Sequence, residues 1–147
     1  MNDRLERFRE VQERDYETAF MEIRSGKKTS HWMWYMFPQI AGLGRSEIAK
    51  YYEISDLNEA ADYIEDPFLG GNLIKLTQAL LELDTDNAGD VMGWPDNMKL
   101  KSSMTLFALA KPDCGVFEKA LDKFFHGEKD QNTIEILNGQ LERNANE

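Results

Sequence analysis

Basic and aromatic side chains suited to binding an anion gather in residues 24–51 of this 147-residue sequence. The basic residues of this window are Arg24, Lys27, Lys28, Arg45 and Lys50, and its one acidic residue is Glu47. The whole chain has a formal net charge of −10, so the window carries +4 and the remaining residues carry −14. The window also holds two of the three tryptophans and one of the two histidines. This composition favours an anionic ligand at this part of the chain.

A glycine turn, Gly42-Leu43-Gly44-Arg45-Ser46, precedes a predicted helix for which Ser46 is the expected N-cap. Backbone N–H groups of such a turn bind anions at a helix N-terminus, and an arginine can add a bidentate contact. No predicted strand precedes the turn, so it is neither a P-loop nor a dinucleotide-binding fingerprint. A tight turn with a serine cap explains the same residues, and both interpretations stay open.

Residues 31–39 are apolar on all sides, which is typical of a buried helix, here ended by Pro38. His31 and Gln39 are polar groups at its two ends and must find hydrogen bonds. On a helix, His31 shares a face with Trp34 and Tyr35, four or fewer positions away. The segment is therefore either a core helix or one wall of a ligand site with His31 as a contact.

Residues 99–107 combine two lysines, Lys99 and Lys101, with the adjacent serines Ser102 and Ser103 and with Thr105. Serine and threonine are poor helix formers, because their side chains compete for backbone hydrogen bonds. Their presence inside a predicted helix indicates either close packing against another helix or a polar pocket.

Other chemistries have little support in the sequence. A triad of Ser102 or Ser103 with His31 and Asp96 lacks the Gly-x-Ser-x-Gly spacing of a nucleophile elbow. The two histidines are 95 positions apart and there is one cysteine, Cys114, so neither a metal site nor an intramolecular disulfide is expected. No cofactor is predicted.

Helical periodicity in nearly every segment predicts the elements that position these side chains. Gly26 should end the first helix, Asp66-Pro67 should start a central one, and Asp130 should cap the last. We expect an all-α fold, a single compact orthogonal domain of about six to eight helices over residues 1–147, with 143–147 as a frayed tail.

Composition narrows the possible partners and the compartment. The acidic balance disfavours general nucleic-acid binding and attachment to an anionic membrane. The charged N-terminus lacks a secretory h-region, and no stretch is apolar enough to span a bilayer. We therefore expect a cytoplasmic protein, and the oligomeric state stays open.

The same stretches carry a family resemblance that covers nearly the whole chain. Its most specific blocks are Ser30-His31-Trp32-Met33-Trp34-Tyr35 and Lys99-Leu100-Lys101-Ser102-Ser103-Met104-Thr105-Leu106-Phe107. With them the sequence resembles a bacterial family called domain of unknown function 1810. The resemblance implies a cytoplasmic all-helical fold and no established activity. Some members carry the name calpastatin, a largely disordered calpain inhibitor, which does not fit the aromatic core expected here.

Three hypotheses for the function follow. The first is a small-ligand site for a phosphate-bearing or nucleotide-like anion, in a pocket between residues 31–39, 42–46 and 99–105. Its predicted binding residues are Lys28, His31, Trp34, Tyr35, Gln39, Arg45, Ser46, Lys99, Lys101 and Ser102. The second is a helical protein-interaction module without a small-molecule site. The third is a hydrolase acting on a nucleotide-type group, with His31 as the proton-transfer residue. A concavity joining His31, Arg45 and the 99–103 helix would favour the first.

Overall fold

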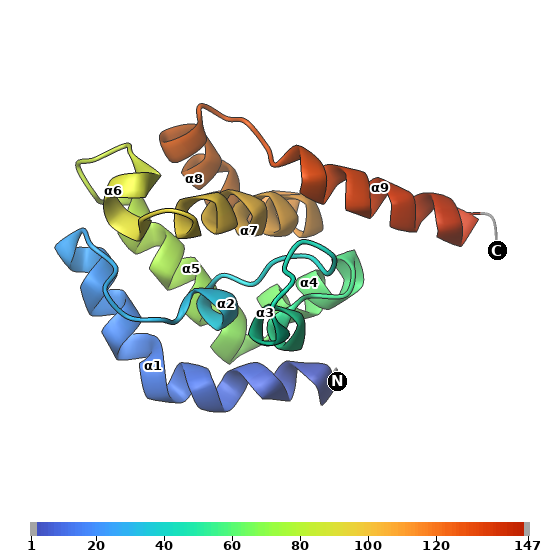
Figure 1. Cartoon of the computed structure of the whole chain (residues 1–147), viewed down its shortest axis with the longest axis horizontal. Coiled ribbons are helices and arrows are strands. Elements are labelled where there is room, and N and C mark those ends of the chain that lie inside the picture. Colours follow the sequence, from blue (N-terminus) through green and yellow to red (C-terminus); the bar gives the residue numbers. More distant parts are fainter. Residues whose placement is uncertain (1–2, 146–147) are drawn as a thin grey trace.

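A computed structural model describes residues 3–145, and the regular structure of this part of the chain is helical (Figure 1). The elements are the 3₁₀ turns Asp3–Leu5 and Pro112–Cys114 and the helices α1 (Glu6–Ser25), α2 (Met33–Met36), α3 (Glu47–Tyr52), α4 (Leu57–Glu65), α5 (Pro67–Leu81), α6 (Ala88–Met92), α7 (Asp96–Ala110), α8 (Val116–Phe125) and α9 (Gln131–Ala145). The all-α prediction is confirmed. The described residues form nine α-helices, more than the six to eight expected, because α2, α3 and α6 are each only one or two turns long.

Capping residues explain where most of these helices begin and end. Gly26, at φ 86°, closes α1 in the left-handed conformation that glycine adopts without strain. The Ser46 side chain accepts a hydrogen bond from the Ala49 N–H at 3.2 Å and so caps α3. Asp66 accepts from two N–H groups at the start of α5, where Pro67 takes the first position. These boundaries agree with the sequence prediction.

The predicted helix over residues 31–39 is wrong in its extent, because only Met33–Met36 is helical. Pro38 has no N–H and disfavours helical geometry at the residue before it, and Phe37 accordingly leaves the helix at φ −132°, ψ 73°. Beyond Pro38 the backbone pairs with another segment instead: Ile54 N donates to Gln39 O at 2.8 Å. Trp32, Met33 and Phe37 are nonetheless buried, as a core segment requires.

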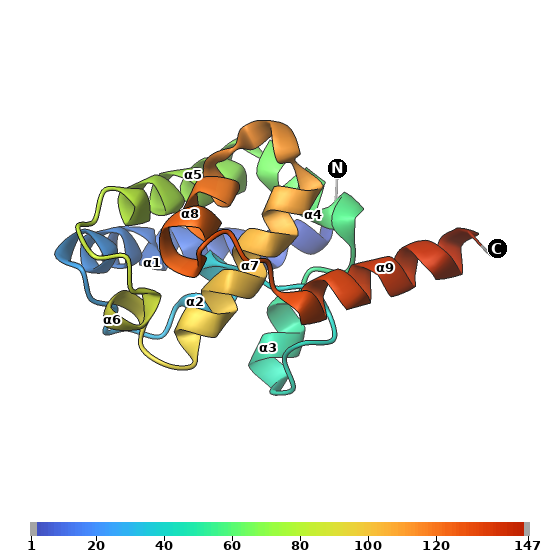
Figure 2. The same ribbon diagram turned by 90° about the horizontal axis from the view of Figure 1, so that it is seen from above.

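Helix α5 packs against α1, α4 and α8, and α7 packs against α4 and α8 (Figures 1 and 2). Close packing of α5 against α4 requires Gly70, since a Cβ there would lie 1.8 Å from the Ile64 carbonyl oxygen. Aromatic rings of Tyr63, Phe107 and Phe117 form the middle of the core, with centroids 5.3 and 5.7 Å apart along the row.

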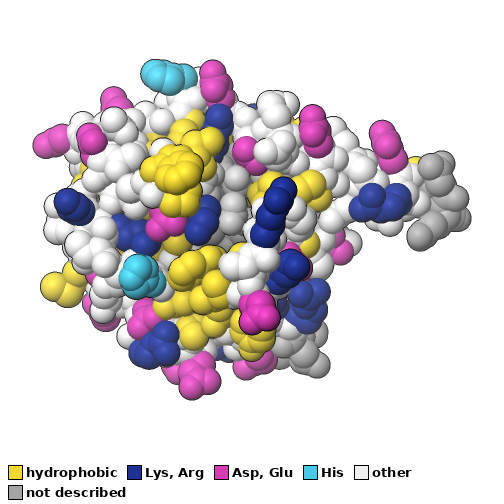
Figure 3. Space-filling view, in the orientation of Figure 1, with side chains coloured by type: hydrophobic (Ala, Val, Ile, Leu, Met, Phe, Trp, Pro, Cys, Tyr) yellow, Lys and Arg dark blue, Asp and Glu magenta, His cyan; other side chains and the backbone are white. Residues whose placement is uncertain are grey.

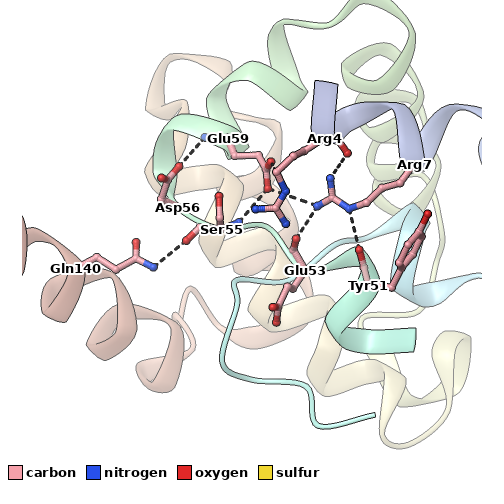
Figure 4. Close-up of polar contacts among 8 residues, drawn as sticks. All are labelled: Arg4, Arg7, Tyr51, Glu53, Ser55, Asp56, Glu59 and Gln140. Carbon is pink, nitrogen blue, oxygen red and sulfur yellow. Dashed lines mark hydrogen bonds and ion pairs between the residues drawn. The ribbon is translucent and has the colours of Figure 1, made fainter. Parts of the chain in front are cut away.

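Helix α9 packs on the body through its N-terminal part, and its end extends beyond the body (Figure 2). Further along, Gln140 Nε2 donates to the Ser55 carbonyl oxygen at 2.8 Å (Figure 4). Thr133 and Leu137 are buried, whereas Leu141 is 55% exposed. The tail predicted over 143–147 thus falls partly in α9, which runs to Ala145, and partly outside the described residues. No helix among the described residues combines the length and the apolar character needed to cross a membrane.

An arginine on α1 fixes the connection between α3 and α4 (Figure 4). Arg7 donates to the carbonyl oxygens of Tyr51 at 2.8 Å and Glu53 at 2.6 Å, and its guanidinium lies 3.4 Å from the buried Glu59 carboxylate. Glu59 also accepts from the Ser55 N–H at 2.9 Å. The stretch 53–55 held in this way is the one that pairs with residues 39–41, so this cluster indirectly places the loop over 37–46.

Candidate functional site

Glu22 on α1 organises the loop that follows Gly26. Its carboxylate accepts hydrogen bonds from Thr29 N at 2.8 Å, Ser30 N at 2.9 Å and Trp32 Nε1 at 3.0 Å, and a fourth from the Ser30 hydroxyl. Partial burial acts to raise the pKa of Glu22, but the four hydrogen bonds outweigh it and lower the pKa from 4.5 to about 2. A carboxylate that stays ionised therefore fixes the backbone next to Lys28.

Lys28 and Lys99 share one carboxylate, that of Asp96 at the start of α7. Lys28 Nζ lies 2.8 Å from Asp96 Oδ2, and Lys99 Nζ lies 3.3 Å from Asp96 Oδ1. Each ammonium also lies over an indole ring, Lys28 at 5.0 Å from the Trp32 centroid and Lys99 at 4.9 Å from the Trp34 centroid. Two cations against one anion leave this cluster with one unit of positive charge. Figure 3 shows basic and acidic side chains together on this face, between hydrophobic patches over α2 and over the first half of α7.

Lys99 also lines a cavity of about 280 Å³, which we call the Lys99 cavity. The cavity lies between the loop over 37–46, the first half of α7 and the start of α9, and it is lined by Gln39, Leu43, Gly44, Pro95, Met98, Lys99, Ser102, Asp130 and Asn132. Three segments that are far apart in the sequence thus meet at one hollow.

Hydrogen bonds from Asp130 join α7 to α9 beside this cavity. Asp130 Oδ2 accepts from the N–H of Thr133 at 3.0 Å and from its hydroxyl at 2.6 Å, and so caps α9. The Asp130 N–H donates to Thr105 Oγ1 at 2.9 Å. Ser102 Oγ lies 3.2 Å from both Asp130 Oδ2 and the Met98 carbonyl oxygen, so its single proton can go to either acceptor. The hydroxyl proton is therefore already engaged within the protein, and the Ser102 oxygen keeps the capacity to accept a hydrogen bond from a ligand.

The serines and the threonine of α7 take part both in close helix packing and in a polar pocket, the two alternatives that their sequence left open. Ser103 is fully buried where α7 packs in the core. Ser102 lines the Lys99 cavity and Thr105 ties α7 to Asp130. Close helix packing and a polar pocket therefore occupy different faces of one helix.

Three of the ten predicted binding residues, Gln39, Lys99 and Ser102, line the Lys99 cavity. Lys28 and Trp34 lie next to it through their contacts with Asp96 and Lys99. These five residues come together from positions 28–39 of the basic aromatic window and from α7.

The other predicted residues are placed elsewhere. His31 and Arg45 are exposed, and neither lines the cavity. Ser46 caps α3. Tyr35 is buried and donates its hydroxyl proton to Asp15; burial and this bond raise the pKa of Tyr35 to about 12. Lys101 faces Glu128 at 3.6 Å, on another side of α7. The expected concavity thus joins residues 39–44 with α7 but excludes His31 and Arg45.

Both glycines of the 42–46 turn have structural reasons to be glycine. Gly42 has φ 104°, and a Cβ on Gly44 would lie 2.4 Å from the Ala49 Cβ on α3. The tight-turn interpretation accounts for them, and Gly44 contributes its backbone to the cavity wall.

Three polar residues of the site, Asp96, Asp130 and Asn132, were not predicted as ligand contacts. The sequence marks both Asp96 and Asp130 as helix-start residues, beside Pro95 and before 131–145, and Asp96 otherwise entered only the unsupported triad. A cap residue whose side chain also faces a cavity gives no separate sequence signal. Among the described residues, no group of three or more His, Cys, Asp or Glu side chains is arranged to hold a metal ion.

Comparison with known proteins agrees with the fold. The family model described as "Protein of unknown function (DUF1810)" matches residues 2–137. The chain is similar to the crystal structure of the conserved hypothetical protein Rv1873 from Mycobacterium tuberculosis, with a TM-score of 0.88 and 39% sequence identity over 90% of this chain and 95% of that one. No curated protein matches the sequence.

Proposed function

Because the chain belongs to the DUF1810 family, whose description assigns no activity, we propose a function from its own geometry: it binds a small anionic molecule in the Lys99 cavity. The observation that carries the proposal is the sharing of Asp96 by two lysines. Asp96 balances only one of the two ammonium groups, and the second, that of Lys99, lies at the cavity wall.

The low exposure of the two lysines strengthens the attraction that their excess positive charge exerts on an anion. The side chains of Lys28 and Lys99 are only 7% and 25% exposed, so solvent screens them less than it screens a surface lysine. The Asp130 carboxylate opposes an anion, but it is held by hydrogen bonds at the positive end of the α9 dipole, which offsets part of its charge. Lys99 is therefore the group on which an incoming phosphate or carboxylate would sit.

Uncharged groups around the cavity fit the remaining atoms of such a ligand. Gln39 and Asn132 supply amide donors and acceptors, and Ser102 supplies a hydroxyl. A volume of about 280 Å³ is close to the lower end of small-molecule sites. The ligand class that fits best is an anion the size of a phosphate ester or a short dicarboxylate.

A thermal-shift screen with inorganic phosphate, pyrophosphate, glycerol 3-phosphate and malate tests the proposal. A ligand at 100 times its Kd adds about 2.7 kcal/mol of stability, which for a chain of this size raises Tm by roughly 8 °C. Lys99→Met keeps an apolar stem against Trp34 but removes the charge, so it should abolish the shift. Lys75→Met, on the exposed face of α5, is the matched control and should retain it.

The proposal fails if none of these anions raises Tm, or if Lys99→Met responds like Lys75→Met. A rise in Tm that is as large in high salt as in low salt would also contradict it, since the attraction is electrostatic.

A further inference from the structure

We propose that a second cavity, on another side of α7, binds a planar nitrogen heterocycle of the nucleobase type. This Asn97 cavity has a volume of about 560 Å³, within the range of small-molecule sites. It lies between the loop before α6, the first half of α7 and the end of α8, and it is lined by Thr85, Asp86, Asn87, Ala88, Gly89, Asn97, Met98, Lys101, Phe124, Phe125 and His126.

Most polar side chains in the loop before α6 hold the loop itself. Asn87 Oδ1 accepts from the Gly89 N–H at 2.8 Å and so caps α6. Thr85 Oγ1 accepts from the Asn87 N–H at 3.1 Å. Asp86 pairs with Lys123 at 2.7 Å. These groups shape the cavity wall and are already engaged.

Asn97, in contrast, has a side-chain oxygen without a donor. Its Oδ1 is buried and makes no hydrogen bond with any residue in the described range 3–145. Leaving such an acceptor unpaired costs about 1–3 kcal/mol. The oxygen has almost no accessible surface in this position, so the amide must turn about its terminal torsion, which is broad in asparagine, before the oxygen meets a donor in the cavity.

Gly89 lies beside the Asn97 amide in the cavity wall. A Cβ on Gly89 would lie 3.1 Å from Asn87 Oδ1 and 3.9 Å from Asn97 Nδ2. The 3.9 Å distance is an ordinary van der Waals contact, so residue 89 adjoins the Asn97 amide without crowding it. Once turned, the amide offers one acceptor and one donor side by side. The edge of a nucleobase with a neighbouring N–H and ring nitrogen, such as that of adenine, is complementary to this pair.

Apolar surface next to the amide suits the face of a planar ring. Met98 is 46% exposed, Phe125 is half-buried, and both line the cavity. Methionine sulfur and an aromatic ring both pack favourably on flat heterocycles. The hydrophobic patch over the first half of α7 in Figure 3 lies on this part of the molecule.

Charges at the rim favour a neutral ligand. Asp86 is paired with Lys123, and Lys101 faces Glu128 at 3.6 Å and lies 5.9 Å from the Phe125 ring centroid. Opposite charges balance in both pairs, so the cavity presents neither the excess cation of the Lys99 cavity nor an excess anion. This second site does not depend on the proposed anion site, although Met98 lines both cavities.

Adenosine is a suitable probe, because it carries the heterocycle without a phosphate. We expect titration of the ¹⁵N-labelled full chain with adenosine to shift the amide signals of Gly89, Met98 and Phe125 and the side-chain NH₂ signal of Asn97. Asn97→Leu should weaken binding at least tenfold while keeping the fold, since it removes an unpaired buried oxygen. Asn138→Leu, on the exposed face of α9, is the control and should bind like the wild type. If Asn97→Leu does not fold, Asn97→Ala makes the same comparison.

The inference is overturned if millimolar adenosine shifts no signals, if the shifts cluster away from α6 and the first half of α7, or if the folded Asn97 variant binds as well as the Asn138 variant. None of these outcomes depends on phosphate binding at Lys99, so the two sites are tested separately.

Discussion

Removal of the Glu22 carboxylate should destabilise the protein and release the segment that carries Lys28. In the structure this one carboxylate accepts four hydrogen bonds, from Thr29, from Ser30 twice and from Trp32. Glu22→Ala leaves all four donors without their acceptor. Glu13→Ala, on the exposed side of the same helix, is the matched control and removes a carboxylate with no such contacts in the described structure.

The size of the effect follows from the number and kind of bonds. A hydrogen bond to a charged group contributes about 1.5–3 kcal/mol, but four bonds to one carboxylate are not additive. Because water replaces part of these hydrogen bonds in the variant, we expect the free energy of unfolding to fall by about 3 kcal/mol. For a chain of this length that corresponds to a fall in Tm of roughly 10 °C, against no more than a degree or two for Glu13→Ala.

The effect should also depend on pH with a defined sign. The pKa of Glu22 is lowered from 4.5 to about 2 by these bonds. A carboxylate with a lowered pKa stabilises the fold fully above the unfolded value, and this stabilisation is lost as pH falls through the folded value. The Tm difference between wild type and Glu22→Ala should therefore be constant above about pH 5 and should shrink between pH 4.5 and 2.

Thermal unfolding of the three proteins, followed by circular dichroism at pH 7 and pH 3, measures this difference directly. Since Trp32 donates to Glu22, tryptophan fluorescence of the variant at 25 °C should change as well. The reasoning is refuted if Glu22→Ala melts with the Glu13→Ala control at pH 7, or if its Tm deficit is as large at pH 3 as at pH 7.

Three further predictions concern the core. Gly70→Ala should lower the free energy of unfolding by roughly 3 kcal/mol or more, because the new Cβ would lie 1.8 Å from the Ile64 carbonyl oxygen. Gly71→Ala, whose Cβ would meet nothing within 4 Å, should raise it by up to about 1 kcal/mol. Chemical denaturation of the two variants tests both, and equal stabilities would contradict the packing. Ser103→Ala should raise Tm by about 3 °C, because the buried Ser103 hydroxyl has no partner among the described residues; a fall in Tm would show that the hydroxyl is bonded. The pKa of Tyr35 is raised to about 12, so the contribution of Tyr35 to folding stability should be complete below pH 10 and lost as pH rises through 12. Tyr35→Phe should therefore lose stability less steeply above pH 10 than the wild type does. Parallel curves for the two proteins in alkaline denaturation would contradict this.

Local signals made the helices predictable. Gly26, Ser46, Asp66 and Asp130 act as caps through contacts with residues at most four positions away, and such contacts follow from residue type and spacing. The helix predicted over residues 31–39 was wrong in its extent because a contact distant in the sequence also decides where it ends. The helix ends early because Pro38 breaks it and because Gln39 pairs with Ile54, fifteen positions away, and only the first of these two facts is local.

The candidate site was predictable in its segments but only partly in its individual residues. Lys99 and Ser102 stood out by composition and do line one cavity. His31 and Arg45 stood out equally and lie on the exposed surface, because the direction of a side chain in a loop depends on tertiary contacts. Asp96 decides the charge of the cluster by pairing with a lysine 68 positions earlier, and no local pattern shows such a pairing.

The central claim is that Lys99 holds an anion in the cavity beside α7, and chemical-shift mapping tests it most directly. In a titration of ¹⁵N-labelled protein with pyrophosphate, we predict saturable shifts at Gln39, Gly44, Lys99, Ser102 and Asn132, which Lys99→Met removes and Lys75→Met preserves. Shifts that are absent, or that spread over exposed lysines such as Lys75 and survive Lys99→Met, would contradict the claim.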